Sequence, residues 1–131
     1  MEKSNMEMKL KLGEVLNLNQ ILKIIIDDSQ SKIDLLLKFK LLGIMKTIEP
    51  LIQNFEIIRN EKINEYGEKT EDGRASIPVE NKEAIEKFNA DIKKLINEEV
   101  TVNITKFKLS DIFDKGLKVE HLLGLYPIIE E

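Results

Sequence analysis

The sequence has no cysteine and only one histidine, and both absences exclude particular kinds of site. A chain without cysteine forms no disulfide, offers no thiolate to a metal and has no cysteine nucleophile, as is typical of intracellular proteins. The single histidine, His121, cannot build a multi-histidine metal site within one chain, and we interpret it as a half-buried or surface residue. Glycine-rich phosphate loops and the HExxH and GxSxG motifs are also missing. We therefore predict that the protein is not an enzyme and has no catalytic residue, no metal and no cofactor.

Long hydrophobic runs are missing as well. The longest aliphatic runs, Ile24 to Ile26 and Leu35 to Leu37, are far shorter than the ~20 residues that cross a bilayer. The opening residues, MEKSNMEMKLKLGE, include acidic side chains and no apolar stretch of the length found in signal peptides. We expect no membrane partner and no export.

Arginine is scarce, since Arg59 and Arg74 are the only exceptions among 20 basic residues that are otherwise all lysine. The 24 acidic residues outnumber the basic ones and give a net charge of −4. A protein of this charge has no global positive field, and readers of nucleic acid usually need several guanidinium groups. We therefore expect no duplex nucleic acid as a partner.

The length of 131 residues predicts one domain, residues 1–131, because two domains would each have a marginal core. With 42% hydrophobic and 34% charged residues, the chain has the composition of a folded protein with a well-solvated surface. Residues 1–7 have no periodicity, and we interpret them as a loose tail.

Two segments with alternating apolar and polar residues predict a small β element. Residues 8–15 alternate in this way and predict a strand, followed by a helix of about ten residues that begins near Asn17 or Asn19. Residues 100–109 alternate too, with a shift of phase at Thr105 and Lys106, and predict a second, bulged strand. The two strands can pair with each other.

The clearest pattern is a long helical stripe over residues 33–66. Its apolar positions advance by steps of three and four and are Ile33, Leu37, Leu41, Ile44, Ile48, Leu51, Phe55 and Ile58. Pro50 lies within the pattern and predicts a kink, because proline removes one backbone hydrogen bond. Gly67 is expected to end the helix in a left-handed conformation.

A second helix is predicted from Asn81 to Asn97, after an Asp72-Gly73 turn, and it would pack antiparallel on the long one. We expect Leu41, Ile48 and Phe55 of the long helix to face its apolar residues Phe88, Ile92 and Leu95. A short helix is expected at residues 119–126, stopped by Pro127. The predicted fold is α+β and mainly helical, a long kinked helix packed antiparallel on a second helix, with a small two-stranded β element from the N-terminal and C-terminal segments.

A further apolar row on the long helix predicts self-association. Leu36, Phe39, Met45 and Ile52 widen the apolar sector beyond what one neighbouring helix covers. We expect a homodimer or a larger homo-oligomer.

Arg59, Tyr66 and Arg74 are the candidate ligand-binding residues. A guanidinium grips phosphates or carboxylates with two parallel hydrogen bonds and stacks on aromatic rings. Arg59 lies two turns before Tyr66, and Arg74 follows the Asp72-Gly73 turn. Together they could bind a small anionic or nucleotide-like ligand. The alternative is that the arginines form salt bridges with Glu56, Glu61, Glu71 or Glu80.

The chain resembles a family of small uncharacterised proteins encoded by phages and prophages of Gram-positive bacteria. The resemblance covers residues 8–129 and is carried by the opening MKLKLGEVL, by YGEK before the Asp-Gly turn, by Phe88-Asn89 and by the segment Glu98 to Ile104. It implies a phage protein that works in the bacterial host cytoplasm and carries over no catalytic residue. We expect a stoichiometric binding protein of the counter-defence type, which captures a host protein or a small nucleotide-like ligand. The alternative is an accessory or chaperone protein for virion or tail assembly.

Overall fold

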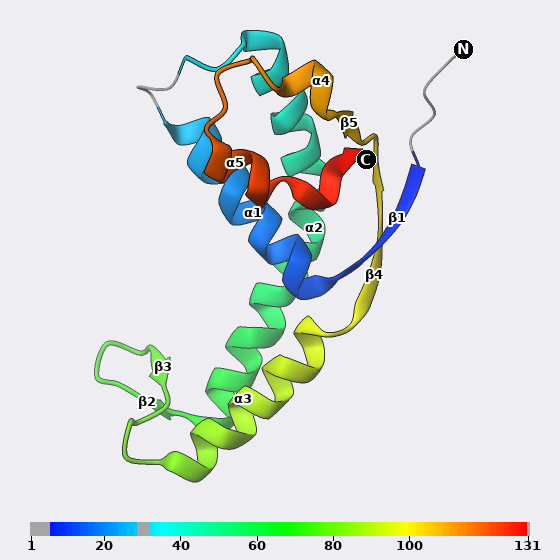
Figure 1. The fold of residues 1–131 in the computed structure, drawn as a ribbon. Helices are drawn as coiled ribbons and strands as arrows, with labels where there is room; N and C mark the ends of the chain where they lie inside the picture. The colour runs from blue at the N-terminus through cyan, green and yellow to red at the C-terminus, as the bar shows by residue number, and fades with distance from the viewer. Residues whose placement is uncertain (1–5, 29–31, 131) are drawn as a thin grey trace.

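The computed structural model describes residues 6–28 and 32–130 and has mainly helical structure (Figure 1). In chain order its elements are β1 (Met6–Lys11), α1 (Leu12–Asp27), α2 (Leu35–Tyr66), β2 (Glu68–Lys69), β3 (Ala75–Ser76), α3 (Lys82–Ile96), β4 (Glu99–Ile104), β5 (Phe107–Lys108), α4 (Leu109–Ile112), α5 (Val119–Gly124), a 3₁₀ turn (Tyr126–Ile128) and β6 (Ile129–Glu130).

The predicted β element is confirmed, because β1 and β4 pair as an antiparallel ribbon. The pairing runs from Met6 opposite Ile104 to Lys11 opposite Glu99. The pattern breaks where the sequence shifts phase, and the chain resumes as β5, which pairs with β6 in parallel. Of the expected tail, residues 1–5 lie outside the described residues, whereas Met6 and Glu7 belong to β1.

The boundary between β1 and α1 was predicted wrongly. The strand ends at Lys11 rather than at residue 15, and the helix begins at Leu12, before Asn17. Two hydrogen bonds stabilise this early start: the Leu12 N–H donates to the carbonyl oxygen of Glu98 at 2.9 Å, and the Lys11 N–H donates to the Glu14 carboxylate at 3.0 Å. From Leu12 onward the buried residues follow helical spacing, as Leu12, Val15, Leu18, Leu22 and Ile25.

The long helix is present as α2, which has 32 residues and continues through Pro50. Its two halves run in different directions in Figure 1, as expected for a helix with an internal proline. Asp34 caps its first turn, since its carboxylate accepts a hydrogen bond from the Leu37 N–H at 3.1 Å.

The first half of α2 belongs to the head, which we define as β1, α1, α2 up to Pro50, and the chain from β4 onward. The head holds the main apolar core, and its most deeply buried large residues are Leu18, Leu22, Ile25, Leu41, Ile48, Ile112, Leu125 and Ile128. Leu41 and Ile48 pack here with α1 and the C-terminal segment, so the expectation that they face α3 was wrong. The helix α1 is longer than predicted. It covers the face of α2 that was expected to pack against α3.

The second half of α2 forms the arm, together with the β2–β3 hairpin and the antiparallel helix α3 (Figure 1). Phe55 is buried in the arm and Phe88 is half-buried. Gly67 ends α2 as predicted, but its φ of −102° is not left-handed. Glycine is required there by close packing, because a Cβ atom would lie 2.6 Å from the carbonyl oxygen of Ser76.

His121 on α5 is buried, with 4% of its surface exposed, and is not the half-buried or surface residue expected from the sequence. Its Nδ1 accepts a hydrogen bond from the Lys118 N–H at 3.3 Å, across the first turn of α5. The histidine therefore stabilises the start of a short helix.

We expect Leu41→Ala and Leu35→Ala to differ sharply in stability, although both truncate a leucine of α2. Leu41 is fully buried and Leu35 is 82% exposed. Losing the buried side chain leaves a cavity and should lower the free energy of unfolding by about 3 kcal/mol, against less than about 0.5 kcal/mol at Leu35. Chemical denaturation measures both values, and equal losses would contradict this assignment of the core.

Candidate functional site

A hollow of the described surface, which we name the head groove, has a volume of about 650 Å³. One wall is the first half of α2, from Asp34 to Thr47, and the other is the chain from Asn103 to Lys115. On α2, the spacing of Leu36, Lys40, Gly43 and Thr47 places these four residues along one side of the helix. A volume of this size is in the range of ligand sites in proteins.

The groove combines an apolar floor with lysines. Leu37, Ile44, Ile104 and Ile112 are buried in its floor, and the half-buried ring of Phe107 lies in its wall. Lys40, Lys106 and Lys115 also line it, and no ion pair joins any of these three to another residue in the part of the chain that the structure describes.

Two aspartates, Asp34 and Asp111, line the groove together with the three lysines. The Asp34 carboxylate is already engaged with the N-terminus of α2, which is the positive end of the helix. The Asp34 N–H also donates to the carbonyl oxygen of Lys115 at 2.9 Å, so this acid joins the two walls. Asp111 is the other acid, and the groove therefore keeps an excess of positive charge.

Gly43 leaves an open space in the α2 wall. A Cβ atom at this position would have no atom within 4 Å apart from the adjoining backbone of its own helix. The Gly43 carbonyl oxygen accepts a hydrogen bond from the Thr47 hydroxyl at 3.0 Å. A side chain added at Gly43 can therefore enter the groove without displacing the backbone.

Exposed apolar residues lie on the first turns of α2, where this helix lines the groove. Leu36 lines the groove and is 61% exposed, and on the neighbouring side of the helix Leu35 and Phe39 are 82% and 71% exposed. Of the row that predicted self-association, Met45 and Ile52 pack against the core of their own chain, whereas Leu36 and Phe39 stay exposed. The exposed part of the row thus belongs to the head groove and its rim.

The sequence-predicted ligand residues lie on the arm, away from this groove. Arg59 pairs with Glu56 at 4.0 Å, one turn earlier in α2, and Arg74 pairs with Asp72 at 3.7 Å. Among the described residues, no hydrogen bond, ion pair or ring contact joins either arginine to Tyr66. The structure therefore shows local ion pairs at both arginines, and a role of the three residues in ligand binding stays a prediction.

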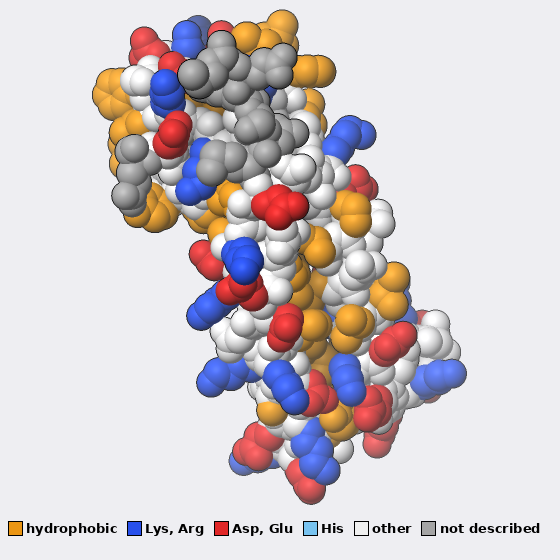
Figure 2. All heavy atoms as spheres, turned by 90° about the vertical axis from the view of Figure 1, so that its right-hand side faces the viewer, with side chains coloured by type: hydrophobic (Ala, Val, Ile, Leu, Met, Phe, Trp, Pro, Cys, Tyr) orange, Lys and Arg blue, Asp and Glu red, His pale blue; other side chains and the backbone are white. Residues whose placement is uncertain are grey.

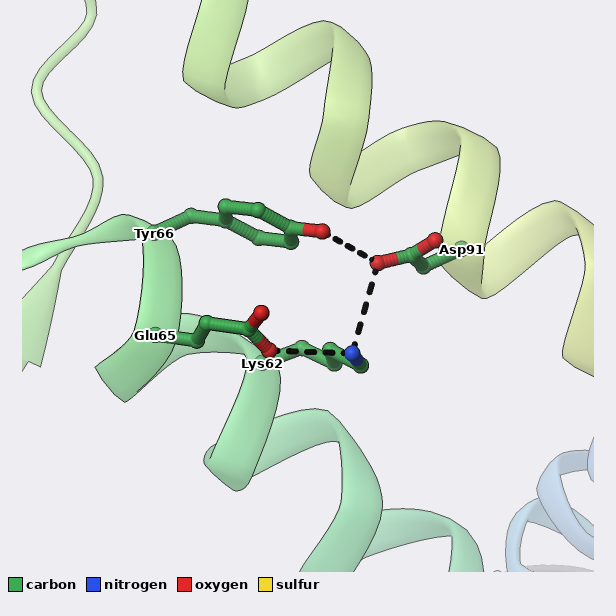
Figure 3. A network of polar contacts seen from close by, with 4 residues as sticks. All are labelled: Lys62, Glu65, Tyr66 and Asp91. Carbon is green, nitrogen blue, oxygen red and sulfur yellow. Dashed lines mark hydrogen bonds and ion pairs between the residues drawn. The ribbon is translucent and has the colours of Figure 1, made fainter.

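Tyr66 instead connects the two helices of the arm (Figure 3). Its hydroxyl donates to the Asp91 carboxylate of α3 at 2.6 Å, and the Lys62 ammonium lies 3.5 Å from the same oxygen. Lys62 also bonds Glu65 at 2.9 Å and lies 5.8 Å from the centre of the Tyr66 ring.

These contacts shift the pKa values of the network. The hydrogen bond from Tyr66, helped by the charge of Lys62, lowers the pKa of Asp91. The hydrogen bond to Asp91 raises the pKa of Tyr66, and the hydrogen bond to Glu65 raises the pKa of Lys62. We name these four residues the Tyr66–Asp91 network. It joins α2 to α3 and keeps the phenol of Tyr66 protonated and the carboxylate of Asp91 charged.

The groove lysines and Phe107 are not among the ligand-binding residues predicted from the sequence. The only signal for them was the phase shift at Thr105 and Lys106, which marks where the chain leaves the ribbon and turns toward α2. Lys40 carries no signal of its own, because a lysine on a helix is usually a solvated residue.

Comparison of the chain with protein-family models, with curated proteins and with solved structures finds no match. The described residues include no cluster of His, Asp or Glu that could hold a metal ion. Within residues 6–28 and 32–130, no helix has the length and apolarity needed to cross a membrane. The head groove is the feature from which a function can be inferred.

The Tyr66–Asp91 network predicts how Tyr66 titrates. Because the Asp91 carboxylate stabilises the protonated phenol, we expect the pKa of Tyr66 to lie above its ordinary value of 10.0 and to fall when Asp91→Asn removes the charge. The phenolate absorbance measures this in a Tyr126→Phe background, where Tyr66 is the only tyrosine.

The same contact makes the stability of the folded chain depend on pH. The folded chain holds the pKa of Asp91 below the unfolded value of about 3.8, so its contribution is present above that value and is lost as the pH falls through the folded pKa. Asp91→Asn should therefore lose less stability than the wild type between neutral and strongly acidic pH. If acidification lowered the stability of both proteins by the same amount, the contribution of the Asp91 contact would be contradicted.

Proposed function

We propose that this chain is a phage-encoded binding protein that acts stoichiometrically in the cytoplasm of a bacterial host, and that its head groove captures a segment of a host protein. The observation that carries the proposal is the combination of an apolar floor with Lys40, Lys106 and Lys115, none of which has an ion pair in the described part of the chain. The resemblance to phage and prophage proteins supports the setting.

The chemistry of the groove favours an amphipathic segment with acidic residues. Apolar side chains of such a segment would cover Leu36 and Phe107, and its carboxylates would pair with the lysines on the rim. Charge complementarity of this kind accelerates encounter and selects among partners.

The exposed residues around the groove favour a protein segment over a nucleotide-like ligand. A small ligand inside the groove would leave Leu35 and Phe39 in water, because neither residue lines the groove, although both lie on the same first turns of α2 as Leu36. Contiguous exposed apolar patches usually mark protein interaction surfaces. A helix or strand that extends beyond the groove would cover both residues.

Filling the groove tests this function directly. We expect Gly43→Phe to place a ring in the open space of the groove and to abolish capture, whereas Gly43→Ala should keep it, since a methyl group leaves the groove open. Native mass spectrometry of each chain purified from a bacterial host reports the stoichiometry and the mass of whatever is retained.

Charge reversal provides a second test of the proposal. Lys106→Glu should weaken capture by about tenfold, and Lys46→Glu, on α2 outside the groove, should not change it. A one-to-one protein complex that survives Gly43→Phe would contradict the proposal. A retained mass of nucleotide size in place of a protein would also contradict it and would support the small-ligand alternative.

A further inference from the structure

The ribbon of β1 and β4 has two strands, so β4 has a second edge that pairs with no other strand of the described residues. This edge lies at the head groove, because Asn103 and Ile104 of β4 both line the groove, whereas residues 7–11 of β1 do not. Side chains of successive strand residues point to opposite faces of a sheet. A groove that is lined by two successive residues of a strand therefore runs along the edge of that strand.

The hydrogen bonds of the ribbon show which main-chain groups of β4 point to this open edge. The Leu12 N–H donates to the carbonyl oxygen of Glu98 at 2.9 Å, and the register of β1 and β4 continues from this bond without interruption. In an antiparallel pair, residues that bond across the ribbon alternate with residues whose N–H and C=O groups point away from it. The even-numbered residues of β4 therefore bond to β1, and the main-chain groups of Thr101 and Asn103 point to the open edge.

Asn103 thus presents an open N–H and an open C=O group where it lines the head groove. Within residues 6–28 and 32–130, neither group has a hydrogen-bond partner. Open main-chain groups beside an apolar floor are the arrangement to which an extended peptide adds as a further strand.

The opposite wall of the groove leaves room for such a strand. Neighbouring strands lie about 4.8 Å apart, so a strand added to β4 would lie between β4 and α2. Gly43 lines this space and has no side chain that would obstruct the main chain of an added strand. The part of α2 that lines the groove, from Asp34 to Thr47, is about 20 Å long, which is also the length of a strand of about six residues.

These main-chain groups distinguish the head groove from the apolar surface of the arm. Figure 2 shows apolar side chains in a line between the two helices of the arm. The N–H and C=O groups along a helix are bonded within the helix, so that surface offers side chains alone and does not specify the conformation of a partner. The open edge of β4 does specify it, because only an extended segment can continue the ladder.

We propose that the segment captured by the head groove binds as a β-strand, which adds to the open edge of β4 and has alternating apolar and acidic residues. This inference rests on the proposed function of the groove and specifies the class of its partner. Residues of an added strand alternate between two faces. Apolar residues on one face would cover the floor at Ile44 and Ile104, and carboxylates on the other face would pair with Lys40 and Lys106.

Removing one main-chain donor tests this mode of binding. Asn103→Pro removes the N–H that faces the groove and keeps the bonds of the ribbon, because this group points away from β1. Thr101→Pro removes an equivalent outward N–H of β4 outside the groove and is the matched control. Asn103→Ala removes the side chain and keeps the N–H. We expect Asn103→Pro to weaken binding at least about tenfold, and both controls to stay within about twofold of the wild type.

Synthetic peptides provide a defined probe. One labelled peptide of about seven residues alternates valine and glutamate, and a second peptide has the same residues in helical spacing. Fluorescence anisotropy measures the binding of both to the full chain, and we expect the alternating peptide to bind at least about tenfold more tightly. N-methylation of alternate residues removes the donors along one edge of the peptide. Methylation of one alternate set should therefore abolish binding, and methylation of the other set should preserve it.

The outcomes separate this inference from the proposed function. Circular dichroism checks that both proline variants keep their fold, and the methylated peptides test the strand on the wild-type chain in either case. No binding of the alternating peptide, equal effects of the two methylated sets, or equal losses in Asn103→Pro and Thr101→Pro would each overturn the strand. Capture of a host protein that is lost in Gly43→Phe and unchanged in Asn103→Pro would also overturn it and would leave the proposed function standing. Capture that survives Gly43→Phe would contradict the proposed function itself.

Discussion

The structure depends on the difference in length between α2 and the core that covers it. A helix of 32 residues is about 48 Å long, whereas a compact chain of this size has a radius of gyration of only about 14 Å. Apolar residues of α1, the β ribbon and the C-terminal segment therefore cover α2 only as far as Ile52. The rest of the helix has to project, and α3 and the hairpin accompany it as the arm. The exposed apolar positions of the arm, such as Ile57 and Ile58, are a consequence of this geometry.

The head and the arm are joined at one compact junction. The N-terminus of α1 meets the C-terminus of α3, where the Leu12 N–H bonds the carbonyl oxygen of Glu98 and a Cβ atom at Gly13 would lie 3.3 Å from the carbonyl oxygen of Ile96. The chain then enters β4, which returns along β1 to the head groove. Where α2 ends, the hydrogen bond from Tyr66 to Asp91 joins it to the second half of α3. The two helices of the arm are therefore held together by polar contacts as well as by a thin apolar core.

Much of the fold could be predicted from the sequence because its longest elements have strong periodicity. The stripe from Ile33 to Phe55 and the alternation in both ribbon strands specify the elements and which side of each is buried. Leu12 shows the limit of such patterns, since it continues the alternation of the strand and also begins the helical row with Val15. A tertiary hydrogen bond from residue 12 to Glu98 decides between them, and no local pattern contains that information.

The candidate site could be predicted less well, for a different reason. Arg59 and Arg74 were selected for the chemistry of guanidinium, but Arg59 forms the alternative ion pair with Glu56, and Arg74 pairs with Asp72, two positions earlier. The head groove depends on Lys40 and Lys106, which come together only when the chain after β4 lies against the first half of α2. Each lysine alone has the appearance of a solvated surface residue. The role of these two lysines depends on the topology. The periodicity of a single sequence indicates which face of a helix or strand is buried, but it does not indicate which elements pack against each other.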